Sequence, residues 1–291
     1  MRISDSVGYR NLLDNLNMLN ARFERAAQQV SSGQRLSHLH VAPSDSAEMV
    51  QLNDQLARLD QFRTNADSSS YFLQVSDSTL NSLYNLVTSI YTVGSEAANS
   101  FNDANALSAL AAEIRSQHDQ ILSLANTQVE GRYIFAGLQT TSPAFTVVGD
   151  TATYQGDGAV NTIRISDGLQ VEGNIPGSAV FSPVFANVEA LLAAVESGDQ
   201  SAIKSSLGQF SSALATVNQV RARLGVNLGK LDDAEAALQT QETNVKTRQS
   251  HIGDVDMAAA ISQLSQIQTA LQAAQAAGSL LKRSNLFDYL A

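Results

Sequence analysis

Apolar residues recur near the start of the chain with the spacing of a helix that buries one face. Between Tyr9 and Val30 they stand three and four positions apart, which places them on one stripe of a mostly polar helix. The stripe consists of Tyr9, Leu12, Leu16, Leu19, Phe23, Ala26 and Val30. Ser32-Gly33 follows, and because glycine tolerates the left-handed turn after a helix, we expect the helix to end there.

A second and longer stripe follows Pro43-Ser44-Asp45. Asp45 with Glu48 three residues later is typical of a capping box, so we expect the next helix to open there. Its apolar positions at seven-residue steps are Leu52, Leu59, Ala66, Leu73, Leu80 and Val87, with Leu83, Ile90 and Ala97 on the adjoining position. After Asn102-Asp103 a third helix is predicted on Leu107, Leu110, Ile114, Ile121 and Leu124.

The stretch 131–174 changes from helical to strand-like periodicity. It holds short β-type runs at 133–135, 145–148, 151–154 and 162–165. Turn signals rich in glycine and aspartate separate them, at 149–150, 156–158 and 167–168. We expect a small antiparallel sheet or a pair of hairpins, closed by Pro176 and Pro183.

Helical periodicity then returns and dominates the rest of the chain. A short helix is predicted over 185–195, ended by Ser197-Gly198, and Asp199 can cap the next one. That helix carries unbroken heptad steps at Ile203, Phe210, Val217, Leu224, Leu231, Leu238, Val245 and Ile252. So long a stripe indicates lengthwise packing against other helices, and we interpret it as core within one subunit. The companion position, four residues after each of these, is less regularly apolar, since Arg221, Glu235 and Glu242 interrupt it.

Gly253-Asp254 separates this helix from the last one. The last helix carries Ile261, Leu264, Ile267, Leu271 and Ala274, and continues through Leu280-Leu281 to Leu286 and Leu290. It is rich in Ala and Gln and nearly uncharged from Ala258 to Leu281, so by itself it would be poorly soluble. We therefore expect this end of the chain to bury itself in a partner.

These elements predict a mainly α fold with a small β region: a long antiparallel helical rod or coiled-coil bundle with a small antiparallel β-sheet inserted mid-chain. The expected parts are a terminal helical assembly domain (1–42 plus 253–291), a helical rod domain (43–130 plus 184–252) and the β region (131–183). The first and last helices would lie together at the base.

Composition and charge narrow the function. Of 291 residues, 44% are hydrophobic but only 6% are aromatic, which suits long helices. The formal net charge of −10 disfavours nucleic acid and anionic membrane surfaces as partners. We also expect no membrane insertion, because no apolar run is long enough to span a bilayer, and no cleaved signal peptide, because residues 1–10 have no apolar core.

Catalytic chemistry finds little support in the sequence. The four histidines, His38, His40, His118 and His251, are spread along the chain, and we read His38 and His40 as a polar loop pair. Asp254 and Asp256 are read as helix caps. Cysteine is absent, which excludes thiol chemistry. No phosphate-binding glycine motif or hydrolase motif occurs, so we expect no enzyme activity, no metal and no cofactor.

Several motifs resemble those of the family of flagellins and hook-associated proteins. Ser31-Ser32-Gly33-Gln34-Arg35-Leu36, followed by Pro43-Ser44-Asp45, resembles the family's signature after the first helix, although the family commonly has two Asp and a Pro where this chain has Asp45-Ser46-Ala47. Further similar segments, in the same order along the chain, are 131–137, 143–145, 154–157, 174–177, 252–258 and 284–290. The ending Phe287-Asp288-Tyr289-Leu290 is closer to the family's hook–filament junction members than to its filament subunits.

The resemblance implies a structural adaptor of the bacterial flagellum at the hook–filament junction. It implies export through the flagellar type III apparatus with an export chaperone, a ring or helical assembly with copies of itself, and two neighbours, the first hook-associated junction protein and flagellin. The terminal helices would be largely disordered in the free subunit and would fold as they associate. In the assembly they would form an inner tube, with the rods as the outer wall and the sheet outermost.

We predict that the two terminal stripes contact neighbouring subunits, since two helices alone share little core. The predicted interface residues are Tyr9, Leu12, Leu16, Leu19, Phe23, Val30, Ile261, Leu264, Leu271, Leu281, Leu286 and Leu290. Three other functions remain as alternatives: a divergent flagellin that forms filaments, a translocator or needle-type secretion protein, and a soluble enzyme. The second would need a membrane-inserting stretch and the third a convergent polar site.

Overall fold

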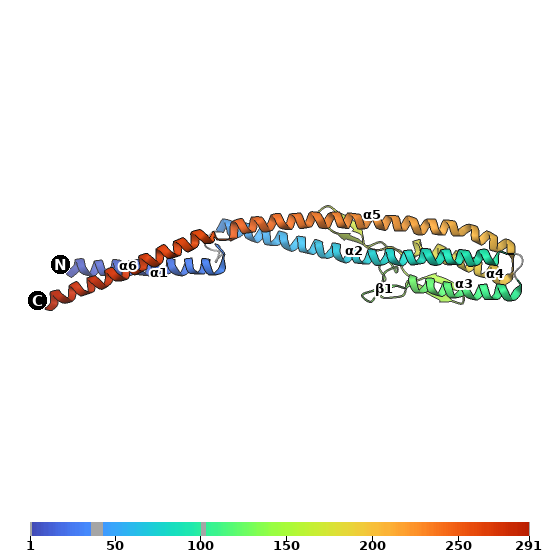
Figure 1. The fold of residues 1–291 in the computed structure, drawn as a ribbon, viewed down its shortest axis with the longest axis horizontal. Helices are drawn as coiled ribbons and strands as arrows, with labels where there is room; N and C mark the ends of the chain where they lie inside the picture. The colour runs from blue at the N-terminus through green and yellow to red at the C-terminus, as the bar shows by residue number, and fades with distance from the viewer. Residues whose placement is uncertain (1, 36–42, 100–102, 291) are drawn as a thin grey trace. The chain divides into compact units, whose positions relative to one another are not determined.

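A computed structural model describes the backbone over residues 2–35, 43–99 and 103–290 (Figure 1). Side chains are described at residue 7 and over 10–35, 43–99 and 103–279. Helix makes up 76% of the structure, and small two-stranded sheets lie mid-chain, which confirms the predicted fold class. The chain divides into two compact units, Met1–Ala57 with Gln241–Ala291, and Arg58–Thr240.

The first unit is built on the two terminal helices, α1 (Arg2–Ser32) and α6 (Met257–Leu290), which pack against each other antiparallel, as expected (Figure 1). Gly33 ends α1 with a φ of 68°, in the left-handed region predicted for it. Asp256 caps α6, since its carboxylate accepts the backbone N–H groups of Ala258 and Ala259 at 3.0 and 3.1 Å.

The same unit contains the start of α2 (Pro43–Ala97) and the end of α5 (Gln200–Gly253). The capping box predicted at Asp45 and Glu48 is wrong. The helix already begins at Pro43, and Asp45, in its first turn, accepts a hydrogen bond from the Arg35 guanidinium at 2.7 Å. Glu48 instead pairs with Arg248 of α5 at 2.8 Å. Both carboxylates that a local cap would have used are thus paired with arginines outside α2, Arg35 and Arg248.

The second unit contains most of α2 and α5, which run antiparallel, together with α3 (Ala104–Ala125) and α4 (Phe181–Ser197). The predicted stripes of α2 and α5 are confirmed as core, because every member is buried except Ile252, which is half-buried. Helix α3 packs on α4. Four buried phenylalanines, Phe135, Phe145, Phe181 and Phe185, join the β region to this core, with the Phe135 and Phe181 ring centroids 4.9 Å apart.

Helix ends in this unit follow the predicted punctuation. Asp103 caps α3 by accepting the Ala106 N–H at 2.8 Å. Gly198 ends α4 with a φ of 67°, and Asp199 accepts the Ser201 and Ala202 N–H groups at the start of α5. The short helix begins at Phe181, four residues earlier than predicted, because one more turn, which carries Phe181 and Val184, is buried on the core.

The β region consists of three two-stranded antiparallel ribbons. They are β1 (Gln128–Val129) with β2 (Arg132–Tyr133), β3 (Phe145–Val148) with β4 (Thr151–Tyr154), and β5 (Thr162–Arg164) with β6 (Gln170–Glu172). Hairpins were expected, but there are three rather than a pair, because β1 and β6 were not predicted as strands. The strand predicted over 133–135 stops at Tyr133. Ile134 and Phe135 leave the ribbon because their side chains are buried in the helical core.

Candidate assembly interface

The pairing of α1 with α6 brings the two predicted interface stripes into one antiparallel seam. Gly278 of α6 lies against Leu12 of α1, so that a Cβ added there would stand 3.1 Å from a Leu12 methyl carbon. At the opposite end of the pair, the Val255 N–H donates to the Gly33 carbonyl at 2.9 Å. The two stripes therefore face each other within one chain.

Burial along this seam is incomplete. On α1, Ala26 is buried, while Leu12, Leu16, Leu19, Phe23 and Val30 are half-buried. On α6, Ala260 and Ile267 are buried, Leu264 and Leu271 are half-buried, and Ile261 is 53% exposed. The predicted residues Tyr9, Leu281, Leu286 and Leu290 lie outside the described side chains.

Apolar surface is also left on the flanks of the pair. Val7, Leu13 and Met18 of α1 are between 41% and 48% exposed, and Met257 of α6 is 42% exposed. Residues 258–281 contain no Asp, Glu, Lys or Arg. Two long helices with a half-covered seam, one of which has no charged residue over 258–281, present a surface suited to further helices.

The ends of four helices meet beside this seam in a junction that the sequence did not predict. We define the Arg35 junction as residues 33–35, Asp45 and residues 252–255. The Arg35 guanidinium donates to the Ile252 carbonyl, at 2.6 Å from Nη2 and 3.2 Å from Nε, and to Asp45 at 2.7 Å. It thereby satisfies a carbonyl in the last turn of α5 and the carboxylate in the first turn of α2.

Backbone pairing reinforces the Arg35 junction. The Arg35 N–H donates to the Gly253 carbonyl at 2.7 Å, and Gln34 and Asp254 form an isolated antiparallel β-bridge. Hydrogen bonding by Arg35, and then by Ser44, lowers the pKa of Asp45 below its ordinary value. The only sequence signal for this arrangement was the position of Arg35 two residues after the helix-ending Gly33.

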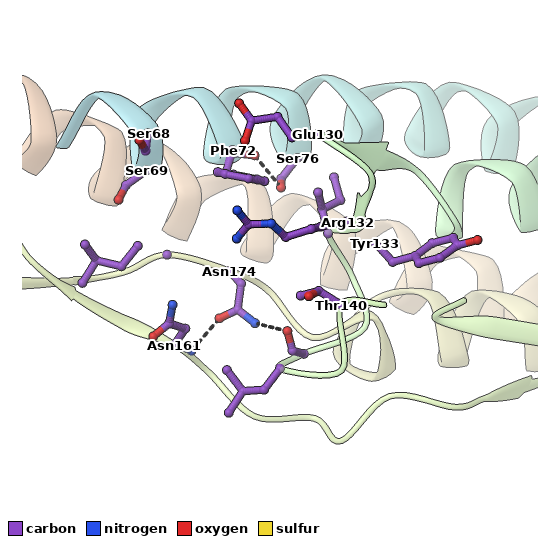
Figure 2. Close-up of a pocket in the computed structure, with 15 residues that line it drawn as sticks. Ser68, Ser69, Phe72, Ser76, Glu130, Arg132, Tyr133, Thr140, Asn161 and Asn174 are labelled. Carbon is purple, nitrogen blue, oxygen red and sulfur yellow. Dashed lines mark hydrogen bonds between the residues drawn. The ribbon is translucent and has the colours of Figure 1, made fainter. Parts of the chain in front are cut away.

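The second unit carries a cleft of about 480 Å³ between α2, the β1–β2 turn and the β5–β6 ribbon (Figure 2). The Arg132 guanidinium lies 6.0 Å from the centre of the Phe72 ring. Asn174 holds the loop together by donating to the Gly137 and Ala159 carbonyls and accepting the Asn161 N–H. The cleft-lining side chains do not include a nucleophile hydrogen-bonded to a base, so we find no catalytic arrangement in it.

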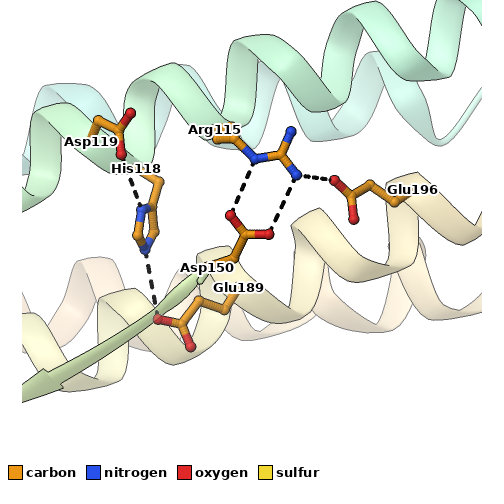
Figure 3. Close-up of polar contacts among 6 residues, drawn as sticks. All are labelled: Arg115, His118, Asp119, Asp150, Glu189 and Glu196. Carbon is orange, nitrogen blue, oxygen red and sulfur yellow. Dashed lines mark hydrogen bonds and ion pairs between the residues drawn. The ribbon is translucent and has the colours of Figure 1, made fainter. Parts of the chain in front are cut away.

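A cluster of charged side chains fixes the β3–β4 ribbon to α3 and α4 (Figure 3). Arg115 of α3 pairs with Asp150 in the β3–β4 turn at 3.2 Å and with Glu196 of α4. These hydrogen bonds, first with Asp150, raise the pKa of Arg115. The buried His118 has Nε2 3.6 Å from Glu189, which accepts the Ala152 N–H at 2.7 Å. Sequence reasoning missed this cluster, because its members are scattered over 81 positions.

Neither the Arg35 junction nor the cluster around Arg115 resembles a metal-binding site. Within the part of the chain that the structure describes, His, Cys, Asp and Glu side chains do not gather in groups of three that could hold a metal ion. The His38–His40 pair lies outside the described residues. Across the same part of the chain, the helices lack the combination of length and apolar character that crossing a membrane requires.

Comparison with known proteins finds similarity along nearly the whole chain. Residues 3–140 match the bacterial flagellin N-terminal helical region, and residues 207–290 match the bacterial flagellin C-terminal helical region. Flagellar hook-associated protein 3 of Escherichia coli (strain K12) is 25% identical over 314 residues, covering 99% of each chain. The protein of that name from Salmonella typhimurium is 24% identical with the same coverage. The crystal structure of Bacillus cereus FlgL is similar with a TM-score of 0.61 and 25% identity, covering 70% of this chain and 100% of that one.

Proposed function

Because this chain belongs to the bacterial flagellin family, we propose that it is a structural adaptor of the hook–filament junction. It is a structural protein rather than an enzyme, as its family is. The observation that carries the proposal is the two-way coverage of 99% with hook-associated protein 3, combined with a terminal helix pair whose apolar seam is only partly covered.

The partly covered seam explains how the subunit would assemble. Neighbouring subunits bury the apolar surface that α1 and α6 leave exposed, including Leu13, Met18 and Ile261. The interface then consists of the predicted stripe residues on both terminal helices, with Leu16 and Leu271 as representatives. Burial of a half-exposed leucine or isoleucine adds roughly 1 kcal/mol, and a ring of subunits repeats that gain at every contact.

The partners are other copies of this chain in a ring or helical array, the first hook-associated junction protein on one face, and flagellin on the other. The subunit reaches this position through the flagellar type III apparatus, delivered by an export chaperone. The complete lack of cysteine suits this route, because the chain moves from a reducing cytoplasm to an oxidising exterior without forming stray disulfides.

A second candidate is a divergent flagellin that forms filaments by itself. The family regions at both ends are described for flagellin, and that observation favours it. The two functions differ in what the subunit needs, since a flagellin polymerises alone, whereas an adaptor requires a different partner at each end.

The test is electron microscopy of a strain that lacks this gene, with analysis of the culture supernatant and complementation by the intact gene. An adaptor predicts hooks without filaments and monomeric flagellin in the medium. Normal filaments would contradict the adaptor and indicate a redundant or minor flagellin. Loss of filaments without shed flagellin would also contradict it and indicate a defect in export or hook assembly.

A further inference from the structure

The cleft in the second unit is lined by two side chains of opposite charge, Glu130 and Arg132. The Arg132 guanidinium extends from β2 into the space between Phe72 and Asn174, and it lies 6.0 Å from the centre of the Phe72 ring (Figure 2). Among the residues that the structure describes, neither of the two charged groups forms an ion pair or a side-chain hydrogen bond.

An unpaired guanidinium in a cleft differs from its neighbours in the same unit. Four other arginines of this unit form ion pairs with carboxylates, namely Arg63, Arg115, Arg164 and Arg221. The walls of a cleft exclude part of the surrounding water, and a charged contact made there is stronger than one on an open helix face. Arg132 is therefore placed to bind an anionic group.

Glu130 occupies a backbone position that is unusual for a glutamate. It forms the two-residue turn between β1 and β2 with Gly131, and the φ angles of the two residues are 50° and 75°. Such turns favour Asn, Asp or Gly, because most other residues are strained at positive φ. In the part of the chain that the structure describes, Glu130 is the only non-glycine residue with a positive φ. Strain of this kind is common at binding sites, and here it keeps a carboxylate at the edge of the cleft.

The walls of the cleft are fixed by contacts within the chain. The Asn174 amide donates to two loop carbonyls and accepts the Asn161 N–H, so it joins three segments of the β region. The side chains of Asn161, Ser68 and Thr140 also line the cleft, and among the described residues they have no hydrogen-bond partner. A preformed cleft with unused polar groups loses little conformational entropy when a ligand binds.

We propose that this cleft is a binding site for a small zwitterion, an α-amino acid with an apolar side chain. The Arg132 guanidinium binds the carboxylate through two parallel N–H groups, and the Glu130 carboxylate binds the ammonium group. The side chain of the ligand packs on the apolar part of the lining, which Phe72, Leu138 and Ile163 supply. The volume of about 480 Å³ is within the range of small-molecule sites.

The two charges together account for the choice of ligand class. Glu130 disfavours a dianion such as phosphate, and Arg132 disfavours a simple cation, so a ligand that carries one charge of each sign is complementary to both. This site is independent of the proposed function, because the cleft lies within the second unit of a single chain.

The test is an NMR titration of the isotope-labelled full-length chain with L-leucine, followed through the Arg132 Nε–H and the Asn161 side-chain amide signals. L-Leucine should shift both signals saturably, with a dissociation constant of about 1 mM or tighter. N-acetyl-L-leucine lacks the ammonium group and L-leucinamide lacks the carboxylate, so each should bind at least about tenfold more weakly.

Substitutions assign the two charges separately. Arg132→Gln should weaken L-leucine binding at least about tenfold, read from the Asn161 signal. Glu130→Gln, which keeps the length of the side chain, should weaken it to a similar extent and make the affinities for L-leucine and N-acetyl-L-leucine equal. Arg223→Gln removes an unpaired, exposed arginine of α5 outside the cleft, so it is the control and should leave binding unchanged. Thermal melting of each variant checks that the second unit is folded.

Several results would overturn the proposal. One is the absence of a saturable shift with L-leucine up to about 10 mM. Others are equal affinities of the unmodified chain for L-leucine and its two derivatives, or unchanged binding by a folded Arg132→Gln variant. Shifts of the same signals that grow with protein concentration without L-leucine would indicate that a side chain of another copy fills the cleft, and would also overturn it. Because the titration uses the purified chain, its result is separate from that of the deletion strain.

Discussion

Arg221 of α5 donates through Nε to the carboxylate of Asp77 of α2 at 2.9 Å, at the heptad position that Leu214 and Leu228 occupy one step before and after. The two side chains are 28% and 36% exposed. A charge in the companion position of the stripe is thus accommodated by a partner on the facing helix, so that the seam between α2 and α5 continues past it.

Arg221→Ala should lower the free energy of unfolding of the second unit by about 1 kcal/mol, because it leaves Asp77 partly buried without its cation. Chemical denaturation of the single variants and of the double variant with Asp77→Ala gives the coupling between them. Arg63→Ala, which removes a more exposed pair with Asp60 on α2 of the same unit, is the control and should cost less than about 0.5 kcal/mol. Equal losses for both variants would contradict the prediction.

Leu16→Asp or Leu271→Asp should abolish incorporation into flagella while the thermal melting of the second unit is unchanged. The reason is that each places a charge in the half-buried seam of α1 and α6, where neighbouring subunits are proposed to pack. Immunoblots of isolated flagella, alongside melting of the purified variants, measure both effects. The neighbouring exposed positions supply matched controls, Asn15→Asp and Gln272→Asp, which should incorporate normally. Incorporation of the leucine variants at the control level would show that the stripes are not interfaces.

Gly177→Ala should destabilise the second unit by about 1–3 kcal/mol, because an added methyl group overpacks a full core. A Cβ at this position would stand 2.9 Å from the Phe145 ring and 3.0 Å from the Phe135 carbonyl oxygen. Gly208→Ala is the opposite case, since nothing lies within 4 Å of its added Cβ and the residue is inside α5. It should stabilise by about 0.5–1 kcal/mol. Thermal and urea unfolding of both variants check the signs, and loss of stability in both would be inconsistent with this packing.

Asp157 should give the β region a defined acid sensitivity. Its carboxylate accepts the backbone N–H groups of Leu138 and Ala159 at 2.9 and 3.1 Å, and these bonds, Leu138 first, lower its pKa below the ordinary 3.8. A lowered folded-state pKa means that the contribution is complete above the unfolded value and is lost as pH falls through the folded one. The loss therefore falls below about pH 3.8.

Carbon-detected NMR titration of Asp157, followed through the Leu138 and Ala159 amide signals, measures this directly. Asp157→Asn should remove the change in chemical shift that the Leu138 and Ala159 amide signals show as the pH falls. Asp119→Asn, at an exposed carboxylate of α3, is the control and should leave it in place. An Asp157 pKa at or above its ordinary value would refute the assignment.

Much of the architecture followed from the sequence, because heptad periodicity and helix punctuation are local properties. The stripes Leu52–Val87 and Ile203–Val245 are buried as their spacing indicated, and Gly33, Asp199 and Asp256 end or begin helices where their side-chain chemistry favours it. The pairing of α1 with α6 also followed, since each helix has only one apolar stripe to bury. The family resemblance agreed with this order of elements.

The tertiary structure alone decided which polar side chains meet. The Arg35 contacts with Ile252 join residues 217 positions apart, and the His118–Glu189 contact joins α3 to α4 across the β region. It also decided that Asp45 binds Arg35 instead of capping its own helix, and that Ile134 and Phe135 enter the core instead of extending a strand. Periodicity reports which face of an element is apolar, but a hydrogen bond or ion pair depends on the position and direction of two side chains, and those are fixed only when the elements have packed.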